Sequence, residues 1–114
     1  MKNVVMFKTE KEDYHKFIVN LGIVPALILL EKFEKLELYE ECGKILGAID
    51  IINKKVIVYK ETKLTDDLIN DVINDYIKMG MTDMNREKLL NRAEKHADSF
   101  ISSNSFIIYK NKGK

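Results

Sequence analysis

The chain has 114 residues, of which 46% are hydrophobic and 32% charged, and its formal net charge is +1. A chain of this length supports one hydrophobic core and not two, so we expect a single globular domain over residues 1–110 and a frayed basic tail at 111–114. The near-neutral charge excludes a uniformly basic nucleic-acid binder, and the lone cysteine excludes an internal disulfide and cysteine-pair metal motifs.

The first third of the chain predicts a strand and two helices. The apolar run at 4–7 is typical of a strand. Thr9 precedes several acidic residues and is expected to cap a helix over about 10–20, which Gly22 ends. Pro25 suits the first turn of a second helix over about 24–34. That helix is apolar nearly all round, which indicates deep burial or a partner.

A third helix is expected over about 36–53. Its apolar residues are spaced three and four apart and form a single stripe: Leu38, Cys42, Ile45, Ile49 and Ile52. Nothing near Lys35 punctuates the chain, so one continuous helix through 34–36 is the alternative. Residues 53–55 are typical of a turn, and the β-branched run at 56–60 predicts a second strand.

Two more helices and a third strand complete the predicted order. Thr65 is expected to cap a helix that Gly80 closes, with an apolar face of Leu68, Ile69, Val72, Ile73, Tyr76 and Met79. Thr82 or Asp83 is expected to cap a last helix to about Ile101. Residues 102–105 break it, and 106–110 form the strand.

The resulting order is β–α–α–α–β–α–α–β. Three short strands far apart in the sequence most economically form one small sheet that helices cover. We therefore predict an α+β fold in which about five helices pack on a three-stranded sheet.

No residue pattern in the chain predicts catalysis, a metal site or a cofactor. Cys42 lies in the middle of an apolar helical stripe, so we expect a buried thiol. His15 and His96 lack the spacing of metal ligands, and no phosphate-binding loop or nucleophile elbow is present. The longest apolar stretch, at 21–30, is about half a membrane span. We expect a soluble cytoplasmic protein that is not an enzyme.

Sorted charges are the more informative feature. Asp67, Asp71 and Asp75 recur every four residues on one helix, and Lys88, Arg92 and Lys95 form a basic stripe on the next. Residues 64–85 carry five acidic residues and one lysine, net −4, and residues 86–114 carry seven basic and three acidic residues, net +4. The two helices could pair as an antiparallel hairpin that offsets these charges. Alternatively, they present an acidic and a basic binding face.

The segment Phe33–Cys42, which reads F-E-x-x-E-x-Y-E-x-C, resembles a helical segment of small uncharacterised phage and prophage proteins from low-GC bacteria. Small phage accessory proteins often bind and block a host defence complex, as anti-CRISPR proteins do. By this analogy, the leading hypothesis is an inhibitor that binds a host protein or ribonucleoprotein in the bacterial cytoplasm, as a monomer or homodimer.

Three alternatives remain. The first is a small RNA- or DNA-binding module that uses the basic stripe. The second is a homo-oligomeric scaffold that associates through the apolar segment 23–30. The third is a small hydrolase or nuclease with a metal site formed by clustered acids.

Overall fold

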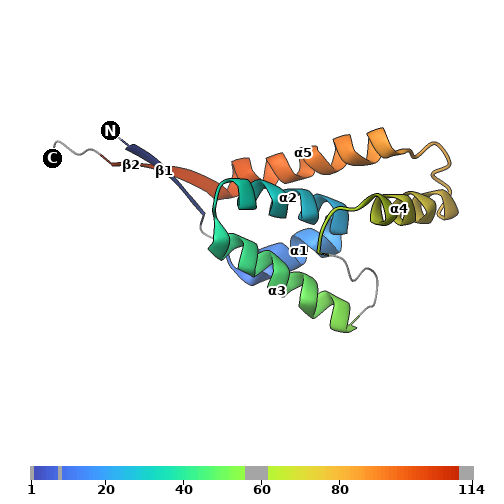
Figure 1. Cartoon of the computed structure of the whole chain (residues 1–114), viewed down its shortest axis with the longest axis horizontal. Coiled ribbons are helices and arrows are strands. Elements are labelled where there is room, and N and C mark those ends of the chain that lie inside the picture. The colour runs from blue at the N-terminus through green and yellow to red at the C-terminus, as the bar shows by residue number, and fades with distance from the viewer. Residues whose placement is uncertain (1, 8, 56–61, 111–114) are drawn as a thin grey trace.

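The computed structural model describes residues 2–7, 9–55 and 62–110 (Figure 1). Five helices lie in this part of the chain: α1 (Lys11–Leu21), α2 (Ile23–Lys35), α3 (Tyr39–Lys55), α4 (Asp66–Lys78) and α5 (Arg86–Asn104). The strands β1 (Lys2–Phe7) and β2 (Ser105–Lys110) flank them in the sequence.

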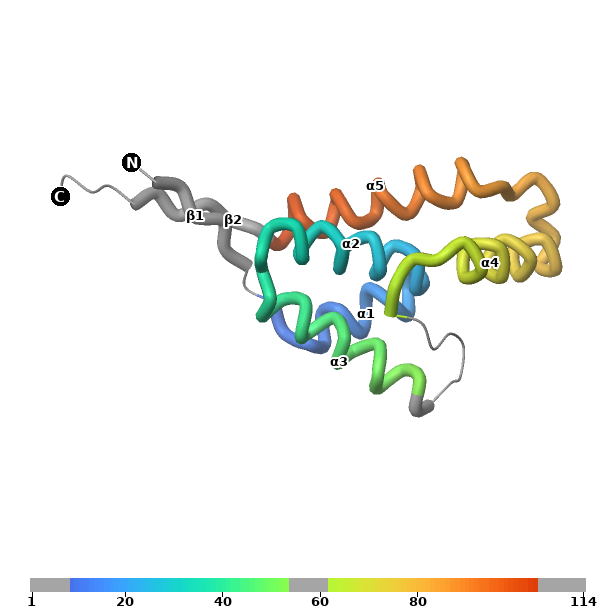
Figure 2. Tube along the Cα trace, viewed as in Figure 1, coloured from blue at the N-terminus to red at the C-terminus, as the bar shows by residue number. Residues whose placement is uncertain are grey.

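Helix α2 is the centre of the helical body. Figure 2 shows it between α5 on one side and the α1–α3 pair on the other, and α2 contacts all three of these helices. Every residue from Val24 to Leu30 is buried, as is Phe33. A helix that is apolar all round becomes stable when neighbours cover its whole circumference. The segment that the scaffold hypothesis requires to be exposed is therefore buried within one chain.

The predicted α+β class is wrong, because the fold is all-helical. In the described part of the chain, helices pack on one another and not on a three-stranded sheet. Strands β1 and β2 pair only with each other, antiparallel from Lys2 opposite Lys110 to Phe7 opposite Ser105, and extend away from the helices (Figure 1). The prediction assumed that the helices need a sheet to cover their apolar faces, but α2 takes that place. The strand predicted at 56–60 lies outside the described residues.

Most of the predicted apolar stripes face the core. The fully buried members are Cys42, Ile45 and Ile49 on α3, Leu68 and Ile69 on α4, and Leu89, Ala93 and Ala97 on α5. The 3.6-residue period therefore identified the inner face of each helix correctly. Met79 is the exception: it was placed on the apolar face of α4, but it follows the last residue of the helix and its side chain is 71% exposed.

The chain breaks between α2 and α3 without a glycine, so the alternative of one continuous helix is wrong. Glu37 adopts a positive φ of 59°, which reverses the chain direction. The N–H of Leu38 donates to the carbonyl of Phe33 at 2.9 Å, and the N–H of Glu37 donates to the carbonyl of Glu34 at 3.1 Å. This pair of bonds is a Schellman motif, in which the residue with positive φ is usually glycine. The predicted separation into two helices is therefore confirmed, but α3 begins at Tyr39 and not near 36, a turn that no glycine marks in the sequence.

Helix ends were predicted with mixed success. Gly22 and Gly80 have φ of 97° and 99° and follow α1 and α4 as expected. The Oγ1 of Thr65 accepts a hydrogen bond from the N–H of Leu68 at 3.2 Å, which confirms the predicted cap of α4. The turn at 53–55 and the helix break at 102–105 are wrong, because α3 continues to Lys55 and α5 to Asn104.

The cap of α5 is also not where the sequence placed it. Neither Thr82 nor Asp83 starts this helix. Asn85 does, and its Oδ1 accepts a hydrogen bond from the N–H of Lys88 at 2.9 Å. Asn85 was not considered in the prediction, although asparagine is as good an N-cap as aspartate and better than threonine.

We predict that Glu37→Gly stabilises the protein. A left-handed conformation costs a non-glycine residue roughly 1–2 kcal/mol, which glycine avoids. Glycine also makes the unfolded chain more flexible, which lowers the free energy of unfolding by roughly 0.4–1 kcal/mol. The net stabilisation is about 0.5–1 kcal/mol. Chemical denaturation measures the change in the free energy of unfolding. Glu40→Gly, in the regular first turn of α3, is the matched control and should destabilise. Equal destabilisation by both substitutions would contradict the assigned turn.

Candidate interaction surface and buried polar cluster

The three predicted acidic residues lie together on one side of α4. Asp67, Asp71 and Asp75 are all exposed. Asp66, at the start of the same helix, forms an ion pair with Arg86 at 2.7 Å, which ties the beginning of α4 to the beginning of α5. The acidic side of α4 therefore faces solvent at the end of the molecule that lies farthest from the strands (Figure 1).

The predicted basic stripe on α5 is only partly available to a partner. The Nζ of Lys88 forms an ion pair with Asp83 at 3.1 Å, and this contact holds the pKa of Asp83 below its ordinary value. Arg92 and Lys95 are exposed, and neither forms an ion pair with another described residue. Within the described part of the chain, two of the three predicted cations thus have no ion-pair partner.

Two acidic residues of α5 have a shared partner inside the fold. Lys32 of α2 lies 3.5 Å from Glu94 and 3.4 Å from Asp98. These residues lie four apart, where like charges repel each other, and the lysine between them offsets that repulsion. The charge sorting of α5 therefore serves partly to dock this helix on α2. Both pairs are partly exposed, so their contribution to stability is small.

A group of exposed apolar side chains marks the point where α4 ends. Ile77, Met79 and Met81 are 39%, 71% and 38% exposed. We call residues 77–81 the α4–α5 tip. The sequence analysis missed this group because it assigned Met79 to the core. Gly80 could have indicated this, because a residue next to the glycine that ends a helix no longer lies on the buried face of that helix.

A pocket of about 90 Å³ lies where the α1–α2 turn meets α4 and α5. Its polar lining comes from Asn20, Tyr76, Arg92 and His96, and its apolar lining includes Val24, Pro25, Val72, Leu89 and Ala93. Pockets that take up a cofactor or drug-sized ligand usually measure roughly 300–1,000 Å³. This pocket is therefore the size for a side chain or a few waters. Of the six predicted site residues, only Arg92 borders it.

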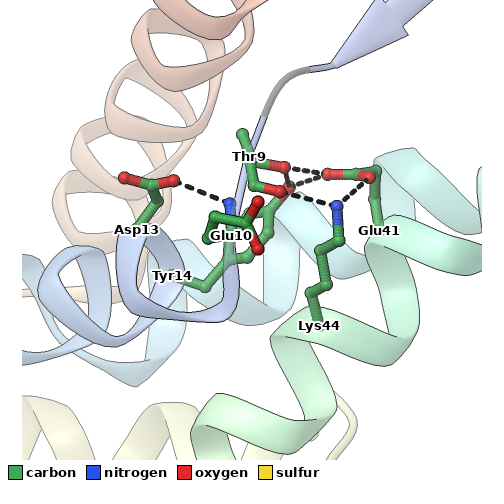
Figure 3. Close-up of polar contacts among 6 residues, drawn as sticks. All are labelled: Thr9, Glu10, Asp13, Tyr14, Glu41 and Lys44. Atoms are coloured by element: carbon green, nitrogen blue, oxygen red, sulfur yellow. Dashed lines mark hydrogen bonds and ion pairs between the residues drawn. The ribbon is translucent and has the colours of Figure 1, made fainter.

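A buried polar cluster joins the start of α1 to α3, as Figure 3 shows. The Glu41 side chain is 8% exposed. Its Oε1 accepts hydrogen bonds from the hydroxyls of Thr9 and of Tyr14, the latter at 2.6 Å. Lys44 contacts Glu41 Oε2 at 3.0 Å and also donates to the backbone carbonyl of Thr9 at 2.6 Å. The cluster thus fixes the chain where β1 leads into α1.

Thr9 has a different role from the one expected from its sequence position, and the pattern of acidic residues after it explains that expectation. Thr9 was predicted as the N-cap of α1, but Glu10 occupies that position, and its N–H donates to the carboxylate of Asp13 at 2.8 Å. Glu41 was missed altogether. One signal could have found it: Glu41 lies four and seven residues before the buried Ile45 and Ala48, so it shares their face of α3.

Ionisation in the cluster follows its contacts. Burial alone would raise the pKa of Glu41, but the hydrogen bonds from Thr9, Tyr14 and Lys44, with the charge of Lys44, outweigh it and leave the pKa below its ordinary value. Burial and the neighbouring Glu41 carboxylate raise the pKa of Tyr14. The cluster therefore holds a carboxylate and a neutral phenol at pH 7. Because the Glu41 carboxylate already accepts hydrogen bonds from three residues, its role is to stabilise the fold.

Cys42 is buried, as predicted, and is 6% exposed. Burial, followed by the charges of Glu34 and Glu41, raises the pKa of its thiol. A nucleophilic cysteine requires the opposite shift. This geometry indicates that Cys42 fills space in the core.

The described residues contain no group of three or more His, Cys, Asp or Glu side chains that could hold a metal ion. No helix among them has the length and apolar character needed to span a membrane. A comparison of the chain with protein-family models, curated protein sequences and solved structures finds no match. Function must therefore be inferred from the surfaces described above.

We predict that Glu41→Gln lowers the free energy of unfolding at pH 7 by about 1.5–3 kcal/mol, because hydrogen bonds to a buried charge are lost. The native contacts lower the pKa of Glu41, so their contribution is present above the unfolded value of 4.5 and is lost as the pH falls through the folded value. The difference between wild type and variant should therefore shrink below about pH 4.5. Chemical denaturation from pH 3 to pH 7 measures it.

Glu40→Gln is the matched control, since Glu40 is the exposed neighbour on the same helix. It should change the free energy of unfolding by less than about 0.5 kcal/mol. A Glu41→Gln effect that stays constant across this pH range would show that the carboxylate charge contributes nothing.

Proposed function

We propose that the chain is a non-enzymatic interaction protein that binds a protein partner through the α4–α5 tip and the acidic side of α4. The observation that carries this proposal is the exposure of Ile77, Met79 and Met81 at the end of the helix that also carries the exposed acidic row Asp67, Asp71 and Asp75. An apolar centre with a charged rim is the usual anatomy of a protein interface. Methionine adapts its shape to a partner surface better than branched side chains do.

Charge at this surface favours a protein over a nucleic acid. The segment 64–85 carries a net charge of −4, which repels phosphate and attracts a basic rim. A basic groove on a protein, or the protein part of a ribonucleoprotein, complements this end of the molecule. The expected partner surface is therefore apolar at its centre and rich in Lys and Arg around it.

The resemblance of Phe33–Cys42 to small phage and prophage proteins supports a more specific version of the proposal. In this version the chain is phage-encoded and acts in the host cytoplasm. It inhibits a host defence complex by occupying a surface that the complex uses, as anti-CRISPR proteins do. An acidic, methionine-bearing surface suits this role, because it can compete for a basic groove that normally receives nucleic acid.

A small RNA- or DNA-binding module is the second candidate, and the exposed cations Arg92 and Lys95 favour it. With two or three phosphate contacts, such a module binds weakly and loses affinity steeply as the salt concentration rises. Binding that survives moderate salt therefore separates the first candidate from the second.

We predict that the tip and the acidic row are both needed to capture the partner. The experiment is a pull-down from lysate of the native host at moderate salt with three proteins: wild type, Met79→Ser/Met81→Ser and Asp67→Asn/Asp71→Asn. Loss of a buried apolar anchor in an interface costs about 2 kcal/mol or more, so each variant should retain less than a tenth of the partner held by wild type.

Tyr39→Ser is the matched control, because Tyr39 is 68% exposed at the start of α3, which lies at the end of the helical body opposite α4 (Figure 1). This variant should capture the partner as wild type does. Circular dichroism verifies that each variant is folded. Equal capture by all four proteins would overturn the proposed surface, and recovery of nucleic acid alone would favour the second candidate.

A further inference from the structure

The pocket at the junction of the α1–α2 turn, α4 and α5 has a feature that the proposed function does not use. Arg92 and His96 lie four residues apart on the same face of α5, and both line the pocket. No ion pair joins Arg92 to any described acidic residue. As far as the described residues go, the guanidinium of Arg92 is therefore available to a group that enters this pocket.

The polar lining fits an anion with two oxygens. Arginine remains charged and presents a planar fork of N–H groups that matches a carboxylate in two parallel hydrogen bonds. Histidine donates one hydrogen bond when neutral and two when charged. Asn20 and Tyr76 add further donors around the same space. These groups can bind both oxygens of a single carboxylate.

The size and the lining of the pocket limit which anionic groups can bind in it. The pocket measures about 90 Å³, and its lining includes the apolar residues Val24, Pro25 and Leu89. Such a lining packs against the methylene groups of an acidic side chain. Helix α4 contributes Val72 and Tyr76 to the lining, and the segment 64–85 that contains it carries a net charge of −4, so a string of phosphates is repelled more strongly than a single carboxylate.

We propose that this pocket receives the carboxylate of one aspartate or glutamate side chain of the protein partner. This inference rests on the proposed function, since it assumes that the partner is a protein. It adds a requirement to the partner sequence: an acidic residue flanked by the basic and apolar residues that meet α4 and the tip. Binding of this carboxylate in the pocket then fixes the position of the partner on α4 and the tip, which charge attraction alone does not determine.

The test uses the isolated protein and two small probes that differ by one functional group. Acetyl-glutamate methylamide and its glutamine counterpart are titrated separately, and the backbone amide signals of residues 20–24 and 92–96 are followed by two-dimensional NMR. Since one exposed arginine supplies most of the attraction, we expect saturable shifts with a dissociation constant on the order of 1 mM for the glutamate probe. The glutamine probe should bind at least about tenfold more weakly.

Variants assign the effect to the pocket. Arg92→Gln should weaken glutamate binding at least about tenfold, and Arg92→Lys should have an intermediate effect because it keeps the charge and loses the fork. Lys95→Gln, on the same helix but not in the pocket lining, should bind as wild type does. Equal shifts from both probes, or tighter binding of inorganic phosphate than of the glutamate probe, would overturn the assignment.

These results do not depend on the pull-down. If the glutamate probe binds saturably and the tip variants still capture the partner, the carboxylate site is supported and the proposed interaction surface is contradicted. If the pocket does not bind the glutamate probe and the tip variants lose the partner, the interaction surface is supported and the carboxylate site is contradicted.

Discussion

The complete burial of α2 is the constraint on which the rest of the structure depends. Its apolar residues from Val24 to Leu30 point in every direction, so neighbours must cover the helix all round. Helices α1 and α3 cover one side and α5 covers the other (Figure 2). Lys32 then pairs with Glu94 and Asp98 at the edge of that contact. Helix α4 shares no comparable contact with α2, which leaves its acidic side and the tip exposed.

The helical periodicities predicted this core well, because buried positions repeat every three or four residues whatever the helix packs against. The period does not say what covers each face. The helix at 24–34 was correctly predicted to be apolar all round. A three-stranded sheet was nevertheless predicted to cover the other helices, although α2 covers α1, α3 and α5. The break between α2 and α3 was placed near Lys35 and not at Glu37, because the residue with positive φ is a glutamate and not the usual glycine. The cap at Asn85 was missed because Thr82 and Asp83, just before it, are also residue types that cap helices.

The candidate surfaces were predicted in part. Charge spacing placed the acidic row of α4 and the basic stripe of α5 on exposed helix faces, which the structure confirms. Spacing could not show that Lys88 is engaged by Asp83, or that Arg92 and His96 border one pocket with Asn20. Those contacts join segments that are distant in the sequence. The Thr9–Glu41 contact spans 32 residues and was invisible for the same reason.

Native-state hydrogen exchange of the backbone amides tests the central place of α2 most directly. If α2 is the hub, the amides of Leu27, Leu29 and Leu30 exchange only when the whole protein unfolds, with a free energy equal to that of global unfolding. The amides of α4 should exchange through local opening at a lower free energy, since this helix has only two fully buried residues. Exchange of α2 that is as fast as exchange of α4 would contradict this account.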